Sequence, residues 1–372
     1  MKTYLLCAPC MFGVEGLLSS ELRRMDAQNV KAENGRVFFE GTAEMIARAN
    51  ICSRYAERIL VAMGRFEART FDCLFENVKA LPWERLIDKN DKFPVKGWSL
   101  ESALYSIPDC QAIVKKAIVE RLKKKYLVPW FNENGVLYQV QFTIMKNEVT
   151  VLIDTSGPGL HKRGYRAMAG NAPIKETLAA AIAELADVRK SRFIYDPCCG
   201  SGTLLIESAL AALRIAPGVN RKFAASFWKQ VPEDIWNRER RRARETEQRD
   251  REFSAIGGDI DKESIALTME NSLKAGVSDF VSATVVDLHD FKINSQGGTV
   301  LCNPSYGERL ADIEEAGRLI RVMGRVFLPR PGWSYYIISP HPRFEELFGR
   351  QADKRRKLYN GMLKCQLYMY YR

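Results

Sequence analysis

One segment, residues 193–203, constrains the fold of this chain more than any other. It reads FIYDPCCGSGT and is followed by an apolar run over residues 204–213. We interpret it as a buried strand that ends at Asp196, a tight glycine turn, and a helix that begins at Thr203. Gly200 and Gly202 have no side chains and let a ligand approach the backbone, while the N-terminus of the helix points at that ligand.

The segments around this turn alternate between helix and strand patterns. They follow a glycine-rich stretch at residues 156–159, which we interpret as a domain boundary. The predicted helices are 174–187, 203–213, 262–275, 316–327 and 343–348, and the predicted strands are 193–196, 255–259, 282–286, 299–302, 333–339 and 363–371. Such alternation is typical of an α/β domain with a doubly wound parallel sheet.

The residues before this boundary have the pattern of two small α+β units. The first has predicted strands 4–8 and 35–41 and helices 14–22 and 43–50, and the second has strands 58–66, 137–143 and 148–154 and helices 71–80 and 109–126. The last helix has a basic outer face, which either binds RNA phosphates or is only solvated. Residues 238–251, rich in Arg and Glu, are expected to form an exposed, salt-bridged helix.

Composition limits the classes of protein that this chain can belong to. Of its 372 residues, 46% are apolar, which indicates a globular protein, and no apolar run approaches the ~18 residues of a membrane helix. Nine scattered cysteines favour a reducing compartment, the cytoplasm, over a disulfide framework. Cys7 and Cys10 have metal-like spacing without a second ligand pair, so we expect no metal. The net charge of +11 suits a polyanionic partner but does not identify nucleic acid.

An acidic residue at the end of the next predicted strand suggests the kind of cofactor. Asp259 is placed to accept hydrogen bonds from both hydroxyls of a ribose. The gap between the glycines and Asp259 is far longer than the ~20 residues of the dinucleotide fingerprint, which favours a nucleoside cofactor without a pyrophosphate. Asp287, after strand 282–286, either binds an adenine amino group or caps a turn.

The second chemical motif is Asn303-Pro304-Ser305-Tyr306, directly after strand 299–302. The Asn303 side-chain oxygen and the Pro304 carbonyl can accept both N–H groups of an exocyclic amine, which directs its lone pair toward a sulfonium methyl group. Tyr306 can stack on the base. An Asn-Pro turn alone is common after strands, but together the two loops indicate an S-adenosylmethionine-dependent N-methyltransferase.

A basic segment follows the glycine-rich boundary, at residues 161–166. Its cations, Lys162, Arg163 and Arg166, can clamp a phosphate, line the cofactor pocket or belong to a basic hinge.

The chain as a whole resembles the THUMP-domain class I RNA methyltransferases, in particular the bacterial group that makes N2-methylguanosine in large-subunit ribosomal RNA. An older name for this group is N6-adenine-specific DNA methylases. The residues that carry the resemblance, besides the two loops, are 13–22, 71–75, 78–83, 160–166, 172–177 and 359–361 with the last strand. The resemblance implies a ferredoxin-like segment at 1–57, a THUMP RNA-binding domain at 58–155, a linker at 156–172, and a Rossmann-like methyltransferase domain at 173–372.

The resemblance also implies roles for individual residues. The cofactor, S-adenosylmethionine, would be held by Asp196, Pro197, Cys198, Gly200, Gly202, Thr203, Asp259, Ile260, Asp287 and Asn303. The target base would be bound by Asn303, Pro304, Ser305 and Tyr306. Structured RNA would be contacted by Lys115, Lys116, Lys123, Lys124, Lys162, Arg163 and Arg166. Two positions depart from the family pattern: Cys198, and Ser305 where the family usually has a second proline.

The sequence therefore predicts a cytoplasmic RNA methyltransferase that modifies an exocyclic base nitrogen, guanine N2 in 23S ribosomal RNA. Its partner would be structured RNA, without a membrane or a metal, and the sequence gives no oligomeric state. One alternative is an adenine-N6 methyltransferase that acts on DNA or RNA. Another is a catalytically weak RNA-binding or ribosome-assembly factor, which would bind the cofactor at most.

Overall fold

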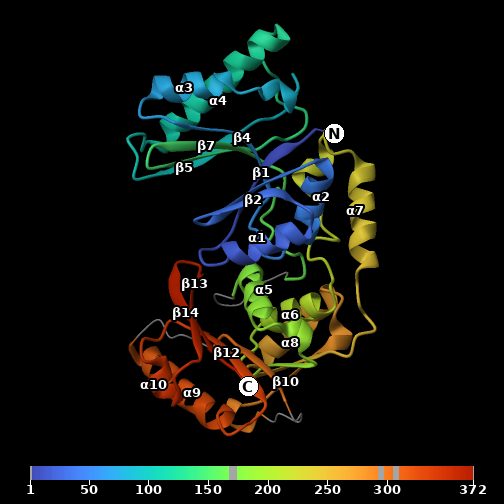
Figure 1. Ribbon diagram of the computed structural model, residues 1–372, viewed down its shortest axis with the longest axis vertical. Helices are drawn as coiled ribbons and strands as arrows, with labels where there is room; N and C mark the ends of the chain where they lie inside the picture. The colour runs from blue at the N-terminus through green and yellow to red at the C-terminus, as the bar shows by residue number, and fades with distance from the viewer. Residues whose placement is uncertain (1, 167–173, 292–296, 305–309, 372) are drawn as a thin grey trace. The chain divides into compact units, whose positions relative to one another are not determined.

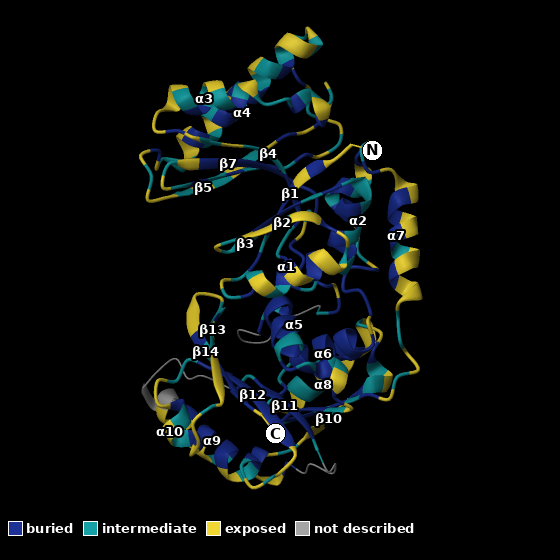
Figure 2. Ribbon diagram, viewed as in Figure 1, coloured by how far each residue is buried: buried dark blue, intermediate teal, exposed yellow. Residues whose placement is uncertain are grey.

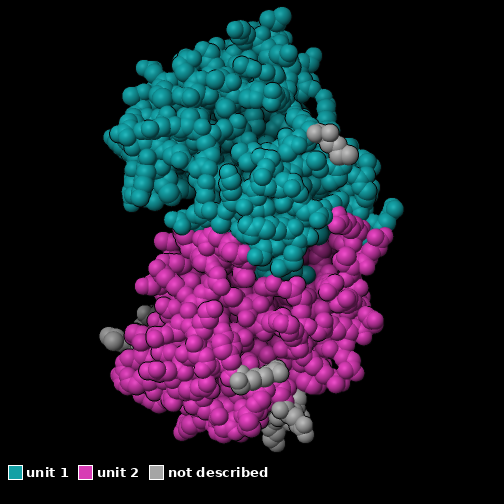
Figure 3. Space-filling view, in the orientation of Figure 1, with its two compact units in different colours: residues 1–10, 19–159, 222–241 teal, residues 11–18, 160–221, 242–372 magenta. Residues whose placement is uncertain are grey.

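The computed structural model describes residues 2–166, 174–291, 297–304 and 310–371. The chain packs into two compact units, which Figure 3 shows in different colours. Unit 1 comprises residues 1–10, 19–159 and 222–241, and unit 2 comprises residues 11–18, 160–221 and 242–372. Residues 222–241 therefore belong to unit 1 although they lie within the predicted methyltransferase segment. Across the described ranges, no helix is long and apolar enough to span a bilayer.

Unit 1 is built on a seven-stranded sheet in the order β2-β3-β1-β4-β7-β6-β5 (Figure 1). Its strands are β1 (Tyr4–Pro9), β2 (Gln28–Glu33), β3 (Arg36–Gly41), β4 (Leu60–Glu67), β5 (Val95–Leu100), β6 (Val140–Met145) and β7 (Glu148–Asp154). β1 pairs with β4, and β4 pairs with β7, so one continuous sheet runs through the predicted ferredoxin-like and THUMP segments. The edge strand β5 is parallel to β6, and the other pairs are antiparallel.

The helices that lie mainly in unit 1 include a long basic one. Their bounds are α2 (Ala43–Cys52), α3 (Phe71–Ala80), α4 (Ile107–Tyr126) and α7 (Glu233–Glu245), while α1 (Glu15–Arg24) has residues in both units. α4 buries Val114, Ile118 and Leu122 at helical spacing and packs on α3 and β5, which leaves its lysines on the outer side. α7 is only partly exposed, because Trp236 is buried and the buried Glu239 pairs with Arg48 (Nε–Oε2 2.8 Å).

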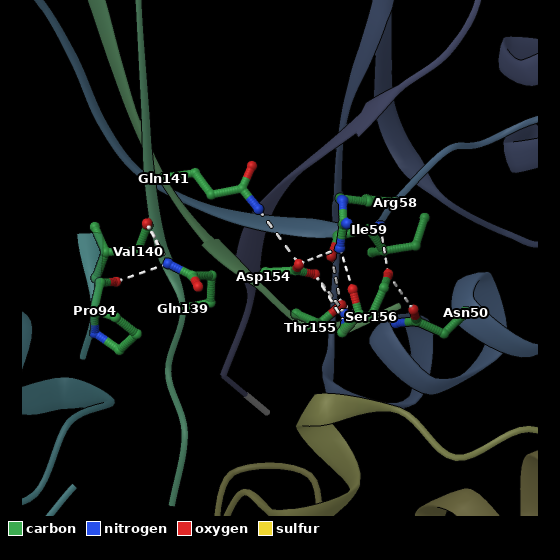
Figure 4. Close-up of polar contacts among 11 residues, drawn as sticks. Asn50, Arg58, Ile59, Pro94, Gln139, Val140, Gln141, Asp154, Thr155 and Ser156 are labelled. Carbon is green, nitrogen blue, oxygen red and sulfur yellow. Dashed lines mark hydrogen bonds and ion pairs between the residues drawn. The ribbon is translucent and has the colours of Figure 1, made fainter. Parts of the chain in front are cut away.

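A buried polar network fixes the end of β7 (Figure 4). Asp154 accepts hydrogen bonds from the Arg58 guanidinium, the Gln141 side chain (3.3 Å) and the Ser156 N–H (2.8 Å). The Ser156 hydroxyl in turn donates to Asn50 Oδ1 at 2.6 Å. Burial raises the pKa of Asp154, while Arg58 and the two backbone donors oppose that rise. The network therefore fixes the end of β7 and Ser156, the residue at which the glycine-rich stretch begins.

Unit 2 contains a second seven-stranded sheet, in the order β10-β9-β8-β11-β12-β14-β13. Its strands are β8 (Phe193–Asp196), β9 (Ser254–Asp259), β10 (Val281–Val285), β11 (Gly298–Cys302), β12 (Trp333–Ser339), β13 (Lys354–Asn360) and β14 (Leu363–Tyr370). Strands β8 to β12 are parallel, and β14 runs antiparallel to β12 and forms a hairpin with β13. The order reverses between β8 and β11, as in doubly wound sheets, and confirms the predicted fold.

Helices cover both faces of this sheet, as Figure 1 shows. α5 (Glu176–Leu185), α6 (Thr203–Ala212) and α8 (Lys262–Lys274) lie on one side, and α9 (Leu310–Phe327) and α10 (Phe344–Phe348) lie on the other. Every residue of β11 and β12 is buried, which is typical of central parallel strands. The core beside them is largely aromatic and includes Tyr195, Phe327, Trp333 and Tyr335.

Three strands were absent from the predicted elements, and two helices, α7 and α9, begin five or more residues before their predicted starts, α9 at Leu310 and not at 316. β2, β5 and β13 were not predicted because their sequences, QNVKAE, VKGWSL and KRRKLYN, lack an apolar run. Each lies at the edge of its sheet, where charged residues are tolerated and discourage pairing with another chain. The arginine-rich helix begins at Glu233, before the predicted 238–251 segment, and ends at Glu245.

Candidate cofactor and base site

The two motif loops follow the carboxyl ends of two neighbouring strands of the unit 2 sheet, β8 and β11. β8 and β11 are parallel, with Ile194 opposite Thr299 and Tyr195 opposite Val300. The residues that end these strands, Asp196 and Cys302, are therefore close to the same level of the sheet. Strand order reverses between β8 and β11, and doubly wound sheets bind ligands at the carboxyl ends of the two strands where this reversal occurs.

The loop after β8 depends on glycines. Gly200 and Gly202 have φ angles of +52° and +78°, in the left-handed region. A Cβ at Gly202 would lie 2.7 Å from Thr268 Cγ2, whereas a Cβ at Gly200 would meet nothing within 4 Å among the described residues. The loop is thus packed against α8 at Gly202 and open at Gly200.

Two residues of α8 support this loop and were missed by the sequence analysis. The Thr268 hydroxyl donates to the Gly200 carbonyl at 2.7 Å, and the Asn271 amide donates to the Ser201 carbonyl at 3.0 Å. Both side chains are buried. In the sequence, the signal for these two residues was a pair of polar side chains three positions apart on an amphipathic helix. When such a pair is buried, its polar groups need hydrogen-bond partners.

Asp196 lies beneath the loop and is almost removed from water. It is 1% exposed, and its Oδ1 accepts a hydrogen bond from the Cys198 N–H at 3.2 Å. Burial raises the pKa of Asp196 to about 8, and the nearby Asp259 carboxylate adds to the rise. This carboxyl group is consequently poised to ionise when a cation arrives.

Asp259, at the end of β9, joins the first loop to the next one. Its Oδ2 accepts from the Gly200 N–H at 2.9 Å, and its Oδ1 accepts from the Asp261 N–H at 3.0 Å. A carboxylate oxygen can accept more than one bond, so both oxygens keep capacity for a ribose hydroxyl. Ile260 follows and is 73% exposed, which presents an apolar surface beside this carboxylate.

Asp287 follows β10 and in the structure caps a short 3₁₀ helix at Leu288–Asp290. It accepts the His289 N–H at 2.8 Å, as in the capping alternative. The residue is nevertheless exposed and follows the strand next to β9 in the sheet. Its predicted contact with an adenine amino group stays a prediction.

The last residue of β11 contacts the loop after β8 through two thiols. Burial raises the pKa of the Cys302 thiol well above its usual range, and a hydrogen bond with the Cys198 side chain raises it further. Asn303 is half-buried, and Pro304 is buried. Ser305 and Tyr306 lie outside the described residues, so only the first half of the predicted base-binding motif has a position in the structure.

The predicted RNA-contacting arginines occupy interior positions near α6. Arg163 is buried, with Nε 3.5 Å from Oε1 of the buried Glu207, and Arg166 pairs with Glu176 at 2.9 Å. Arg166 Nη1 also lies 3.5 Å from the Thr203 hydroxyl. These contacts favour a structural role over an RNA contact, whereas the neighbouring Lys162 is exposed.

The lysines of α4 that were predicted to contact RNA differ in exposure and in whether they already pair with a carboxylate. Lys115 is held by Glu133 (2.5 Å) and lies over the Phe93 ring, and burial lowers the pKa of its ammonium group. Lys123 lies 3.8 Å from Glu120. Lys116 and Lys124 are exposed. Only part of the basic face is therefore available to a polyanion.

Three family models match the chain, in the predicted order. Residues 5–60 match the RlmL ferredoxin-like domain, residues 68–154 match the THUMP domain, and residues 163–369 match the RMKL-like methyltransferase domain.

Relatives match over the whole length of the chain. A Bacillus subtilis (strain 168) protein named "Putative RNA methyltransferase YpsC" is 42% identical over 373 residues, which cover 100% of this chain and 97% of that protein. The "Ribosomal RNA large subunit methyltransferase K/L" of Desulfotalea psychrophila is 30% identical over 98% of this chain and 52% of that protein. The chain thus spans about half the length of this second relative.

A solved structure shares the fold throughout. It is described as "SMU.472, a putative methyltransferase complexed with SAH" and has 41% identity and a TM-score of 0.94, covering 100% of this chain and 98% of that one.

Proposed function

The chain belongs to the RMKL-like methyltransferase family, and we propose that it transfers a methyl group from S-adenosylmethionine to N2 of a guanine in large-subunit ribosomal RNA. The observation that carries the proposal is the meeting of two loops at the point where strand order reverses, one with an open side at Gly200 and one that begins with Asn303-Pro304. The names of the relatives support RNA as the substrate.

The residues at the sheet edge fit S-adenosylmethionine, which supplies an activated methyl group on a sulfonium centre. The open side of Gly200 admits a ligand to the backbone, and the first N–H groups of α6 have no partner within the helix. Asp259 would accept hydrogen bonds from the ribose hydroxyls. Asp196, whose pKa is raised to about 8 by burial, would ionise beside the positive charge of the cofactor.

Asn303 and Pro304 would position the target amine. An exocyclic amine is a weak nucleophile because its lone pair is delocalised into the ring, and two acceptors on its N–H groups localise that pair. The Asn303 side-chain oxygen and the Pro304 carbonyl supply these acceptors, and Tyr306 would stack on the base. After transfer the amine nitrogen carries an extra proton, which is acidic enough to pass to solvent without a dedicated base.

Unit 1 would deliver the RNA. Residues 68–154 match the THUMP model, and their exposed cations, Lys116 and Lys124 among them, suit a phosphate backbone. All nine cysteines are free thiols in the structure, which supports a reducing compartment such as the cytoplasm.

The test is methyl transfer to ribosomal RNA from cells that lack the protein, read by nucleoside mass spectrometry. We expect N2-methylguanosine, and we expect Asn303→Ala to reduce the rate by about 10²–10³-fold because a positioned acceptor is lost. Asn237→Ala, at an exposed position of α7, is the matched control and should retain the wild-type rate. N6-methyladenosine as the product, label in DNA alone, or an undiminished rate in Asn303→Ala would each refute the proposal.

A further inference from the structure

The edge strand β5 exposes one side of the unit 1 sheet. Its residues alternate, with Lys96, Trp98 and Leu100 exposed and the residues between them half-buried. Trp98 is 47% exposed and Leu100 is 53% exposed. A single exposed apolar side chain is ordinary, but two large ones side by side on one face of an edge strand form a patch of the kind that marks an interaction site.

The exposed side chains lie on the face opposite α4. Gly97 pairs with Phe142, and a Cβ at Gly97 would meet the Phe142 ring at 2.5 Å. Phe142 is fully buried, and α4 packs on β5, so this is the covered face. Trp98, one residue further along the strand, points to the other side.

Register extends the exposed surface onto β6. Lys96 lies opposite Gln141, Trp98 opposite Thr143, and Leu100 opposite Met145. Paired residues share a face of the sheet, so these six residues form one surface, which we call the β5–β6 face. Gln141 is held in place by its hydrogen bond to Asp154, as Figure 4 shows.

The composition of the β5–β6 face suits a single-stranded polyanion. It joins an aromatic ring to hydrogen-bonding side chains and a lysine, and none of its six side chains is a carboxylate. The two carboxylates that adjoin it, Asp154 at Gln141 and Glu148 opposite Met145, are paired with Arg58 and Arg65. Within the described ranges, Lys96 makes no ion pair, in contrast to Lys115 and Lys123 of α4. Lysine is depleted in protein–protein interfaces, and a lysine on an edge strand opposes pairing with a second copy.

We propose that the β5–β6 face binds an unpaired segment of RNA, with one base stacked on Trp98 and its neighbouring phosphate held by Lys96. The two residues are about 7 Å apart along the strand, within reach of one nucleotide. Aromatic stacking of unpaired bases on an exposed sheet face is an established mode of RNA recognition. The inference rests on the proposed function only in taking RNA as the substrate.

Figure 2 shows the exposure of the strands on which this face lies. The test uses the full chain and two fluorescent RNA probes: an unstructured strand of about ten nucleotides and a fully paired hairpin. Affinities are measured by anisotropy for the wild type, Trp98→Ala, Trp98→Phe and Trp130→Ala. Trp130 is the matched control, since it is 78% exposed but lies outside the β5–β6 face.

We expect Trp98→Ala to weaken binding of the unstructured strand by about tenfold or more and to leave hairpin binding nearly unchanged. Trp98→Phe should retain most of the affinity, because a phenyl ring still stacks. Trp130→Ala should behave as wild type. Thermal unfolding should show a folded protein for every variant, with some loss of stability in Trp98→Ala because about half of the residue is buried, and a smaller loss in Trp98→Phe.

Three results would overturn the inference: equal affinities for Trp98→Ala and wild type, equal losses in Trp98→Ala and Trp130→Ala, or equal losses for the two probes. Dissociation of a dimer by Trp98→Ala, with RNA affinity unchanged, would assign the face to a second copy instead. These outcomes are separable from methyl transfer, because Trp98 has no role in the chemical step and each assay can fail alone.

Discussion

The Asp196 carboxyl lies out of water although its proposed partner is a cation. Burial raises its pKa from an ordinary 3.8 to about 8. Over the pH range between these two values, the unfolded chain holds this group ionised while the folded chain holds it protonated. Folding therefore takes up a proton, and stability from this group is lost as pH rises toward 8.

Asp196→Asn should remove this pH dependence, because an amide keeps the shape and the acceptor for the Cys198 N–H but does not ionise. The free energy of unfolding of the variant relative to wild type should rise by at least about 1 kcal/mol between about pH 5 and about pH 8. Urea unfolding at both pH values measures this difference. A difference that does not change with pH would show that Asp196 is already ionised in the free protein.

Residue positions were predictable where a role is tied to a strand end. Asp196, Gly200, Asp259 and Asn303 each follow a recognisable apolar run, and parallel strands bring such ends to one edge. The pairing of Arg163 and Arg166 with Glu207 and Glu176 was not predictable, because no local sequence pattern links the arginines to acids on the mainly apolar helices α6 and α5. Their predicted RNA contact stays a prediction. A cation looks the same in sequence whether it faces water or a buried acid.

At the scale of elements, strand prediction succeeded in the interior of each sheet and failed at three of the four edge strands, β2, β5 and β13, while the edge strand β10 was predicted. β8, β11 and β12 are almost entirely buried and rich in apolar and aromatic residues, so their sequences alone identify them. β5 and β13 derive their strand conformation from hydrogen bonds to a neighbour, which leaves little trace in side-chain pattern. The proposed RNA surface lies on such an edge and was not predicted, whereas the sequence analysis placed RNA contacts on lysines of α4 and on Lys162, Arg163 and Arg166.

Two glycines of α9 differ in what their missing side chains allow. A Cβ at Gly324 would lie 2.0 Å from the Phe348 carbonyl oxygen at the end of α10, whereas one at Gly317 would make ordinary contact with Leu347 at 3.5 Å. The close approach of α9 to α10 therefore requires a glycine at position 324 but not at position 317.

Gly324→Ala should lower the free energy of unfolding by about 1–3 kcal/mol, because α9 and α10 must separate. Gly317→Ala should be neutral or stabilise by up to about 1 kcal/mol, since alanine favours a helix over glycine. Chemical denaturation of both variants measures the pair. Equal effects at the two positions would contradict the packing of α9 on α10.

At the scale of the whole molecule, the count of 56 Lys and Arg residues overstates the number of cations available to RNA. Many cations are already committed: Arg48 to Glu239, Arg65 to Glu148, and Arg121 to Glu84. A guanidinium that is already paired with a carboxylate is less available to neutralise a phosphate and release its counterion, so RNA binding should use a minority of the cations.

The salt dependence of RNA affinity counts the cations that contact phosphates, because each phosphate neutralised on a single strand contributes about −0.7 to the slope of log K against log salt. We expect Lys96→Gln to make the slope for the unstructured strand shallower by about 0.7, since one phosphate contact is lost. Trp98→Ala should weaken binding without changing the slope, because stacking releases no counterions. A slope changed by Trp98→Ala but not by Lys96→Gln would mean that the phosphate contact lies elsewhere and that Trp98 acts only through the shape of the surface.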